Sequence, residues 1–386
     1  SLAVSKGHAG LQLDGARDLL DGDDPAIAWP DAGDWQRQLA TSRWVAAPVD
    51  PAQPSDTQAP LVLEGAHGAP DLLYLRRYRE YERRVASGLQ RLARPAKEAG
   101  GVDLVTGGPG TGKTTTIARM LVQLLEQARA AGKPDPRIAL AAPTGRAAER
   151  MAESVRNALQ ALAAEGTDSD VITALPTGGS TLHRLLGTIP DSPRFRHDAD
   201  NPLPYDVVVV DEASMIDLPL MAKLVEAVPD GARLVLLGDP DQLPSVEAGD
   251  VLAGILAAAS NPRATSDTSP ARGGGRAEGA GGGALRPAAH APTFPVRHIH
   301  LARGYRQSAA LDVAPLATAV RSGDADRALA LLRSGQLSGV HFHEGDTDPL
   351  QSHRDHLLAH WTALADTTDP AEALARANRL RILTAV

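Results

Sequence analysis

The sequence predicts an α/β fold in which helices cover both faces of a parallel sheet. Four apolar runs of strand length are separated by stretches with helical periodicity. Strands of this kind are apolar throughout because both faces of their sheet are buried. A polar cluster follows each run, at the edge where open α/β sheets bind ligands. The runs lie at residues 102–105, 137–142, 206–210 and 234–237.

The first run leads into a glycine-rich loop, GGPGTGKT, and then into an amphipathic stretch that predicts a helix. This is a Walker A pattern between a strand and a helix. Its glycines let backbone N–H groups surround a polyphosphate, Lys113 supplies a positive charge, and Thr114 can bind Mg²⁺. A purely structural turn is the alternative, but the flanking elements favour nucleotide binding. The predicted nucleotide-binding residues are Gly108, Pro109, Gly110, Thr111, Gly112, Lys113, Thr114 and Thr115.

An acidic pair, Asp211 and Glu212, ends the third run. Phosphoryl hydrolysis beside a Walker A loop requires one carboxylate to hold Mg²⁺ and another to orient and deprotonate water. We therefore expect Thr114 and Asp211 to hold the metal and Glu212 to act on the water. Helix capping is the alternative role for such a pair.

Two further side chains fit the same chemistry. Gln242, after the fourth run, could hydrogen-bond the γ-phosphate or its water, or could be a turn residue. Arg306 could stabilise transition-state charge as an arginine finger, or could form a surface salt bridge.

Two clusters are suited to a phosphodiester backbone. Pro143, Thr144 and Arg146 open one predicted helix, and Thr181 and His183 open another. Helix N-termini that carry hydroxyls bind phosphates. The same hydroxyls also cap helices, so spacing alone leaves both roles open.

Composition places few other limits on function. The chain has 386 residues, 43% of them apolar, which allows two or three domains. The absence of cysteine excludes disulfides and thiolate chemistry. With a net charge of −8, nucleic-acid binding would need a local basic groove. We expect no membrane segment and a cytoplasmic protein.

We predict four segments. Residues 1–95 form an N-terminal partner-binding module, 96–260 the nucleotide-binding domain, 261–296 a flexible Gly/Ala-rich insertion, and 297–386 the truncated start of a second domain. Within the first segment, a helix is expected from Leu72, with Tyr74, Tyr78 and Tyr81 at helical spacing. Such an aromatic stripe is usually core, although contact with a partner or DNA is possible.

The ordered clusters resemble the motifs of superfamily 1 helicases of the 5′-to-3′ class, and most closely the RecD family of RecBCD exonuclease V subunits. The matching segments are GGPGTGKTTT (107–116), APTGRAA (142–148), STLHRLLG (180–187), VVVDEASMIDLPLMAKLV (208–225), LLGDPDQLPSVEAGDVL (236–252) and LARGYRQ (301–307). The resemblance covers roughly residues 61–386 apart from the insertion.

This resemblance implies two RecA-like domains and a DNA-dependent ATPase that moves 5′-to-3′ along single-stranded DNA in double-strand break repair. Lys113 and Thr114 would hold MgATP, Asp211 the metal, Glu212 the attacking water, Gln242 the γ-phosphate, and Arg306 would complete the site. The implied DNA contacts are Pro143, Thr144, Arg146, Thr181 and His183. The implied partners are DNA ends and RecB-like and RecC-like subunits.

Two alternatives remain. A stand-alone helicase of the same class would carry extra N-terminal DNA-binding repeats, which this sequence does not show. A fragment with a mainly structural or regulatory role is the second. The later motifs of the family, including its final arginine, are not found before Val386, and no adenine-reading Gln is convincingly placed before the Walker A loop.

Overall fold

The computed structural model describes two units, which we treat separately. The boundary between them falls at residues 306/307. The structure describes residues 3, 8–16, 30–48, 54, 58–65, 72–93, 100–108, 111–239, 242, 251–260, 296–301, 313–344, 351, 353–377 and 379–380.

The N-terminal part of the first unit contains a small four-stranded sheet and the helix α2 (Ala32–Ala40). The strand order is β1-β4-β3-β2, with β4 antiparallel to both of its neighbours and β2 parallel to β3. The strands are β1 (Gly10–Gln12), β2 (Val45–Ala46), β3 (Leu61–Glu64) and β4 (Leu72–Leu75).

Strand β4 corrects one prediction. We expected a helix from Leu72, but Leu72–Leu75 pairs with β1 and β3, and helix α3 (Arg76–Ala93) begins directly after it. Tyr74 is therefore buried in the small sheet, while Tyr78 is buried on the helix. The stripe belongs to core in both elements, and the 76–93 part of the helix prediction is confirmed.

A six-stranded parallel sheet forms the centre of the first unit, in the order β10-β5-β9-β8-β6-β7. This arrangement confirms the predicted α/β fold. The strands are β5 (Gly101–Gly107), β6 (Ile138–Ala142), β7 (Ser180–Thr181), β8 (Val207–Val210), β9 (Arg233–Gly238) and β10 (Val296–Leu301).

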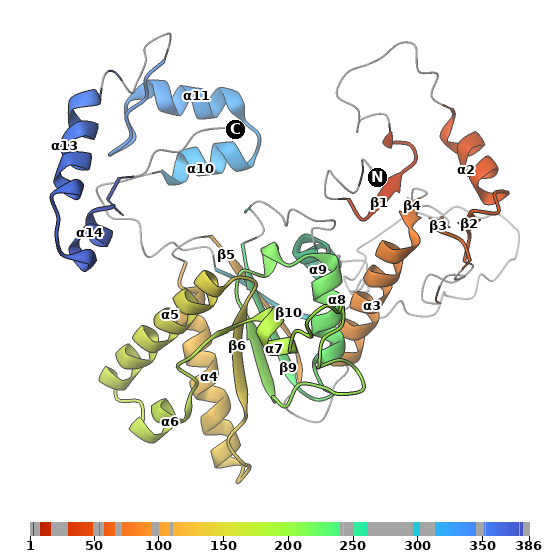
Figure 1. The fold of residues 1–386 in the computed structure, drawn as a ribbon, viewed down its shortest axis with the longest axis horizontal. Coiled ribbons are helices and arrows are strands. Elements are labelled where there is room, and N and C mark those ends of the chain that lie inside the picture. Colours follow the sequence, from red (N-terminus) through yellow and green to blue (C-terminus); the bar gives the residue numbers. More distant parts are fainter. Residues whose placement is uncertain are drawn as a thin grey trace, which may run out of the picture. The chain divides into compact units, whose positions relative to one another are not determined.

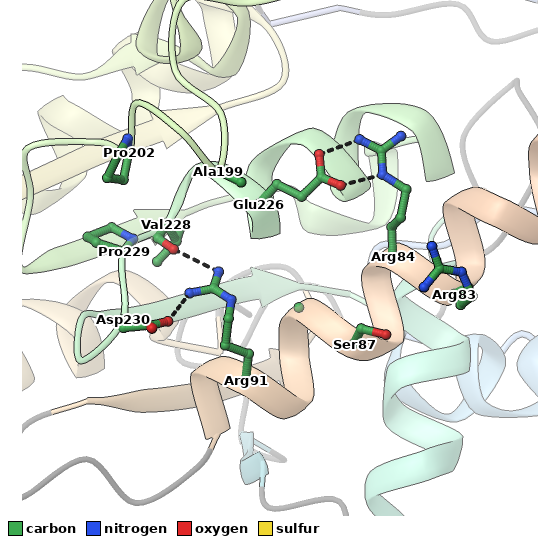
Figure 2. A pocket seen from close by; sticks show the side chains of 11 residues that line it. Arg83, Arg84, Ser87, Arg91, Ala199, Pro202, Glu226, Val228, Pro229 and Asp230 are labelled. Carbon is green, nitrogen blue, oxygen red and sulfur yellow. Dashed lines mark hydrogen bonds and ion pairs between the residues drawn. The ribbon is translucent and has the colours of Figure 1, made fainter. Parts of the chain in front are cut away.

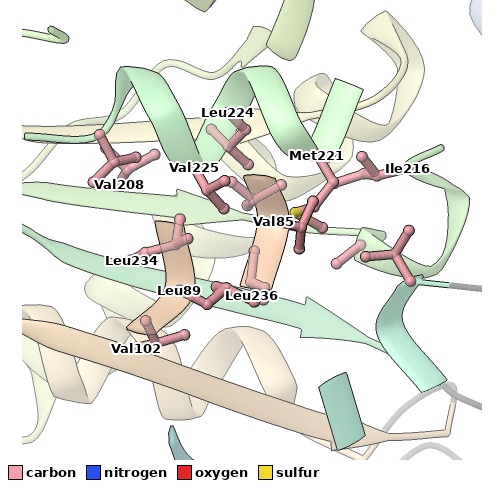
Figure 3. Close-up of a cluster of buried hydrophobic side chains, with 14 of the residues drawn as sticks. Val85, Leu89, Val102, Val208, Ile216, Met221, Leu224, Val225, Leu234 and Leu236 are labelled. Carbon is pink, nitrogen blue, oxygen red and sulfur yellow. The ribbon is translucent and has the colours of Figure 1, made fainter. Parts of the chain in front are cut away.

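Helices cover both faces of this sheet (Figure 1). On one face lie α4 (Lys113–Ala130), α5 (Gly145–Ala164) and α6 (Ser169–Ala174). On the other lie α3, α7 (Leu182–Leu186), α8 (Leu218–Ala227) and α9 (Val251–Ser260). Successive strand residues point into different cores, as the side-chain alternation of a strand requires. Val208 contributes to the α8 core shown in Figure 3, and Val209 to the α4 core.

Helices α3 and α8 pack closely because a glycine lies at their contact. A Cβ added to Gly88 would lie 2.7 Å from Cγ2 of Val225. Around this contact, Arg84 forms an ion pair with Glu226, and the Nη2 atom of Arg91 donates to the carbonyls of Val225 and Val228 at 2.7 and 2.9 Å. Arg91 thereby satisfies free carbonyls at the end of α8.

Strand β10 corrects a second prediction. We assigned residues 297–301 to a second domain, but β10 pairs in parallel with β5 as an edge strand of the first sheet. Polar contacts join the two strands. The hydroxyl of Thr106 lies 2.8 Å from Nε2 of His298 and 3.0 Å from Nδ1 of His300, and buried Asp103 accepts a hydrogen bond from Arg297 at 2.9 Å. Only the three-dimensional pairing reveals this arrangement, because about 190 residues separate the partners along the chain.

The described residues of the second unit form helices with little core. These are α10 (Ala314–Arg321), α11 (Ala325–Ser334), α13 (Arg354–Ala365) and α14 (Pro370–Ala377). Helices α11, α13 and α14 contain no buried residue among those described. No described helix in either unit combines the length and apolar character needed to cross a bilayer.

Candidate nucleotide site and adjoining sheet edge

The Walker A loop follows β5 where the sequence predicts it. Gly112 has a φ of +85°, in the left-handed region that glycine adopts without strain, and α4 begins at Lys113. Gly107 is tightly enclosed, since an added Cβ would lie 2.6 Å from Oγ1 of Thr111 and 2.8 Å from the carbonyl oxygen of Leu301. The edge strand β10 therefore contacts the start of the loop directly.

The Lys113 ammonium group donates a hydrogen bond to the carbonyl of Gly107. Thr111 closes the loop from the other side, because its hydroxyl donates to the carbonyl of Gly108 at 2.9 Å. Thr114 lies partly exposed and Thr115 exposed, both in the first turn of α4. The first N–H groups of a helix are free to bind an anion, so this end of α4 can receive phosphate.

The acidic pair lies beside Lys113. The Asp211 amide donates to the carbonyl of Ala141 at 2.9 Å, and the Glu212 amide donates to the Asp211 carboxylate at 2.9 Å. Glu212 adopts a left-handed conformation with a φ of +53°, which costs a non-glycine residue about 1–2 kcal/mol. The strained turn holds two neighbouring carboxylates at one sheet edge.

Burial raises the pKa of Asp211, against the hydrogen bond from Glu212 and the charge of Lys113, which lower it. Burial and the charge of Asp211 raise the pKa of Glu212, while Lys113 lowers it. Both carboxylates are thus close enough to Lys113 for its charge to act on them. Two partly buried acids that repel each other favour the binding of a cation.

A third acid was missed in the sequence analysis. Asp239, directly after β9, is buried, and its charge raises the pKa of Glu212. Its position immediately after a buried strand was the available signal. Gln242 lies partly exposed nearby, and its backbone N–H donates to the carbonyl of Asp239 at 3.2 Å. The structure thus places Gln242 on the same edge as the acidic pair.

The two clusters considered for phosphodiester binding lie together farther along this edge. Strand β7 pairs with β6, so that Thr181 lies opposite Ala142. Thr144 accepts from the Ala147 amide at 3.2 Å and Thr181 from the Arg184 amide at 3.2 Å, so both hydroxyls cap helices. Capping does not exclude a second role, because Thr144 and the other cluster members Arg146 and His183 are exposed and Pro143 and Thr181 are partly exposed.

Three predicted site residues, Pro109, Gly110 and Arg306, fall outside the described part of the chain. Their assigned roles stay predictions.

A cavity of about 440 Å³ lies between α3 and α8, lined by Arg84, Arg91, Glu226 and Asp230 among others (Figure 2). Its lining loop precedes β9, whereas the Walker A loop follows β5, and the two strands run parallel. The cavity therefore lies at the opposite end of the sheet from the predicted site. Arg84 and Arg91 pair with the acids Glu226 and Asp230 across it, as the dashed lines in Figure 2 show, so the cavity belongs to the packing contact between α3 and α8.

The oxygen atoms at the predicted site suit Mg²⁺. The Thr114 hydroxyl and the Asp211 carboxylate are hard ligands of the type this ion prefers, and Mg²⁺ usually takes only one or two protein carboxylates together with phosphate oxygens. In the described ranges, no group of three or more His, Cys, Asp or Glu side chains that could enclose a metal occurs.

Comparison with known proteins agrees with this geometry. Residues 90–248 match a family model described as an AAA domain, a P-loop NTPase fold that binds nucleotide. The chain is 38% identical over 390 residues to the RecBCD enzyme subunit RecD of Mycolicibacterium smegmatis, covering 94% of this chain and 60% of that protein. The corresponding protein of Mycobacterium tuberculosis is 38% identical over 387 residues, covering 92% and 57%.

A second kind of relative matches a shorter region. The ATP-dependent RecD2 DNA helicase of Deinococcus radiodurans is 40% identical over 156 residues, covering 40% of this chain and 18% of that protein. Among solved structures, one of Pif1 helicases at forked DNA aligns with 64% of this chain and 50% of its own at 19% identity, with a TM-score of 0.31.

The chain spans about 60% of the length of the curated RecD proteins that it matches. Nearly all of it aligns with them, and the nucleotide-binding motifs lie on the parallel sheet that such motifs require. The chain is therefore a homologue of these RecD proteins over the part of their length that it spans.

Proposed function

We propose that this protein is the ATP-driven 5′-to-3′ single-stranded DNA translocase subunit of a RecBCD-type exonuclease, acting on DNA ends in the cytoplasm. One observation supports this most directly. A lysine and carboxylate site at the ends of β5, β8 and β9 shares its sheet edge with two exposed hydroxyl-capped helices at β6 and β7. Both candidate sites therefore lie on one rigid element, the six-stranded sheet.

At the nucleotide site, Lys113 would exchange its bond with Gly107 for the outer phosphates of ATP. Thr114 and Asp211 would hold Mg²⁺, which when bound neutralises developing charge on the phosphates. Glu212 would orient and deprotonate the attacking water. Gln242 would report on the γ-phosphate, and Arg306 would supply transition-state charge.

At the DNA site, Pro143, Thr144, Arg146, Thr181 and His183 would contact the strand through its phosphates. Such contacts carry no sequence information. They suit a protein that must move along any sequence, and they make its affinity fall with rising salt. The net charge of −8 therefore does not oppose the proposal, because the contacts are local.

The subunit role is favoured over the stand-alone one by the extent of the two similarities. The RecD subunits align with 92–94% of this chain, whereas the RecD2 helicase aligns with 40%. We therefore propose RecB-like and RecC-like partners, a partner-binding role for residues 1–95, and a second RecA-like domain that begins after β10.

ATP hydrolysis with and without single-stranded DNA tests the proposal. In the protein at its natural length and with its partner subunits, we expect DNA to stimulate hydrolysis and Lys113→Ala to reduce the rate by about 100-fold or more. The control is Lys133→Ala, an exposed lysine just after the C-terminal end of α4. A rate that responds neither to DNA nor to Lys113→Ala would refute the motor role and leave a structural one.

A further inference from the structure

Two histidines of the second unit face each other. His343 lies in the segment that follows α11, and His353 directly precedes α13. Their Nε2 atoms are 3.4 Å apart, while their ring centroids are 5.2 Å apart with the rings inclined at 78°. Because the nitrogens are closer than the centroids, each nitrogen lies on the side of its ring that faces the other ring. Both side chains are exposed, so an ion from solution can reach the two nitrogens.

The separation of the two nitrogens suits a shared metal ion better than a hydrogen bond. Hydrogen bonds from nitrogen donors are usually about 2.7–3.2 Å long, so a separation of 3.4 Å is long for one. Zn²⁺ binds imidazole nitrogens at about 2.0–2.1 Å in a tetrahedral arrangement. Two ligands at corners of that tetrahedron lie about 3.3–3.4 Å apart. The two Nε2 atoms therefore have the spacing of two ligands on one ion.

Both imidazoles are carried by anchored backbone and, among the described residues, neither forms another hydrogen bond. His353 is the N-cap residue of α13, but its side chain makes no capping hydrogen bond. Its carbonyl accepts from the Leu357 amide at 3.0 Å, which fixes it to the first turn of the helix. Glu344, next to His343, accepts from Nε of Arg333 on α11 at 2.9 Å. Anchoring of this kind reduces the conformational entropy that is lost when a ligand binds.

We infer that His343 and His353 together bind one divalent transition-metal ion of the Zn²⁺ type, with water completing its coordination. Imidazole nitrogen is a ligand that suits Zn²⁺, Ni²⁺ and Cu²⁺. Closed structural zinc sites have four protein ligands, whereas the described ranges contain no group of three or more His, Cys, Asp or Glu ligands. The bound ion should therefore be exchangeable. This inference does not depend on the proposed motor function.

Such an ion would connect helices that share little core. Helices α11 and α13 contain no buried residue among those described. Metals or disulfides commonly stabilise proteins whose cores are small, and this chain has no cysteine. The positive end of the α13 dipole opposes a cation, but Asp355 in the first turn offsets it. A ligand that binds only the folded state raises stability, so Zn²⁺ should stabilise the second unit.

Isothermal titration with Zn²⁺ tests the inference in the full chain without an added histidine tag. We expect His343→Gln and His353→Gln each to weaken the binding of one ion by at least about ten-fold, because loss of even a supporting group costs that much. Electron paramagnetic resonance with Cu²⁺ identifies the ligands, and we expect two imidazole nitrogens in the wild type and one in each variant. Zn²⁺ should also slow hydrogen exchange at the start of α13 in the wild type only.

His341→Gln is the matched control, because it removes an exposed histidine from the same segment as His343. It should leave the affinity for Zn²⁺ unchanged. Equal affinities of the wild type, His343→Gln and His353→Gln would overturn the inference, and so would an equal loss of affinity in His341→Gln. The Cu²⁺ spectrum of the wild type needs no substitution, and a single coordinated nitrogen there would also overturn the inference.

Discussion

Asp211 is a partly buried carboxylate beside Lys113, whose ammonium group is already hydrogen-bonded elsewhere. The ammonium group of Lys113 donates to Gly107, so it offsets the burial of Asp211 only in part, and the pKa of Asp211 stays above its ordinary value. A buried ionised group whose charge is not fully balanced lowers the stability of the fold. The residue therefore favours function at the expense of stability.

Asp211→Asn should for this reason make the nucleotide-free protein more stable at neutral pH, by about 1 kcal/mol. Its ATP hydrolysis should be lost, because the amide binds Mg²⁺ poorly. Thermal unfolding and an ATPase assay measure the two effects. The control is Asp200→Asn, whose exposed side chain should change the free energy of unfolding by less than about 0.5 kcal/mol.

The gain in stability from Asp211→Asn should increase with pH. The pKa of Asp211 is raised on folding, so the stability it contributes is largest at low pH, where both states are protonated, and falls as pH rises through the raised value. The stability difference between Asp211→Asn and the wild type should therefore grow as pH rises above the ordinary value of 3.8. A difference that shrinks over that range would contradict this account.

The sequence identifies a site residue when its role follows from the residues next to it in the chain. The positions of Lys113, Thr114, Asp211 and Glu212 follow from a motif and the strand before it. Asp239 was overlooked although it directly follows the fourth apolar run, and only the folded chain shows that it is buried.

Among the elements, the packing of α3 against α8 depends on a glycine that lets the two helices approach closely. Gly88→Ala would place a methyl group 2.7 Å from Cγ2 of Val225. Overpacking of this kind costs about 1–3 kcal/mol, which exceeds the gain in helix propensity of about 1 kcal/mol. We expect a lower melting temperature in thermal unfolding.

Gly254 supplies the matched control for this prediction. It also lies inside a helix, α9, but an added Cβ would meet no atom within 4 Å. Gly254→Ala should therefore be neutral or stabilising by up to about 1 kcal/mol. Equal effects of the two substitutions would contradict the proposed packing of α3 on α8.

The stability that edge strand β10 contributes should fall in mild acid. Partial burial and the neighbouring His300 lower the pKa of His298, which shares the Thr106 hydroxyl with it. A lowered pKa contributes stability above the ordinary value of 6.5, and this is lost as pH falls through the lowered value.

We therefore expect the wild type to lose stability relative to His298→Gln as pH falls from 7.5 to 5. The loss should be less than about 1 kcal/mol because the side chain is largely exposed. Thermal unfolding across that range measures it, and His356→Gln in the second unit controls for the removal of a histidine. Parallel curves for wild type and His298→Gln would refute the role of this contact.

The elements that the sequence predicted correctly are those formed by an uninterrupted run of apolar residues. The four apolar runs became β5, β6, β8 and β9. The helix predicted from Leu72 was wrong over its first four residues, because β4 passes into α3 without a loop and Tyr74 happens to fit the helical period. β10 was assigned to the wrong domain because its partner lies far away in the chain.

For the molecule as a whole, burial differs sharply between the two units. Strands β8 and β9 are almost fully buried, whereas α11, α13 and α14 have no buried residue among those described. Amide hydrogens in poorly buried helices exchange through low-energy openings. We therefore expect hydrogen exchange in α13 to be at least about 100-fold faster than in α4. Similar protection would show that other parts of the protein cover α13.

The strand order also fixes the distance between the Walker A loop and Thr181. Four strand-to-strand steps separate β5 from β7, which at about 4.8 Å each amounts to roughly 19 Å. Backbone hydrogen bonds span this whole width, so the Walker A loop and Thr181 keep a constant separation throughout a catalytic cycle. Each step of the proposed motor along DNA must therefore come from the movement of another domain or subunit relative to this sheet.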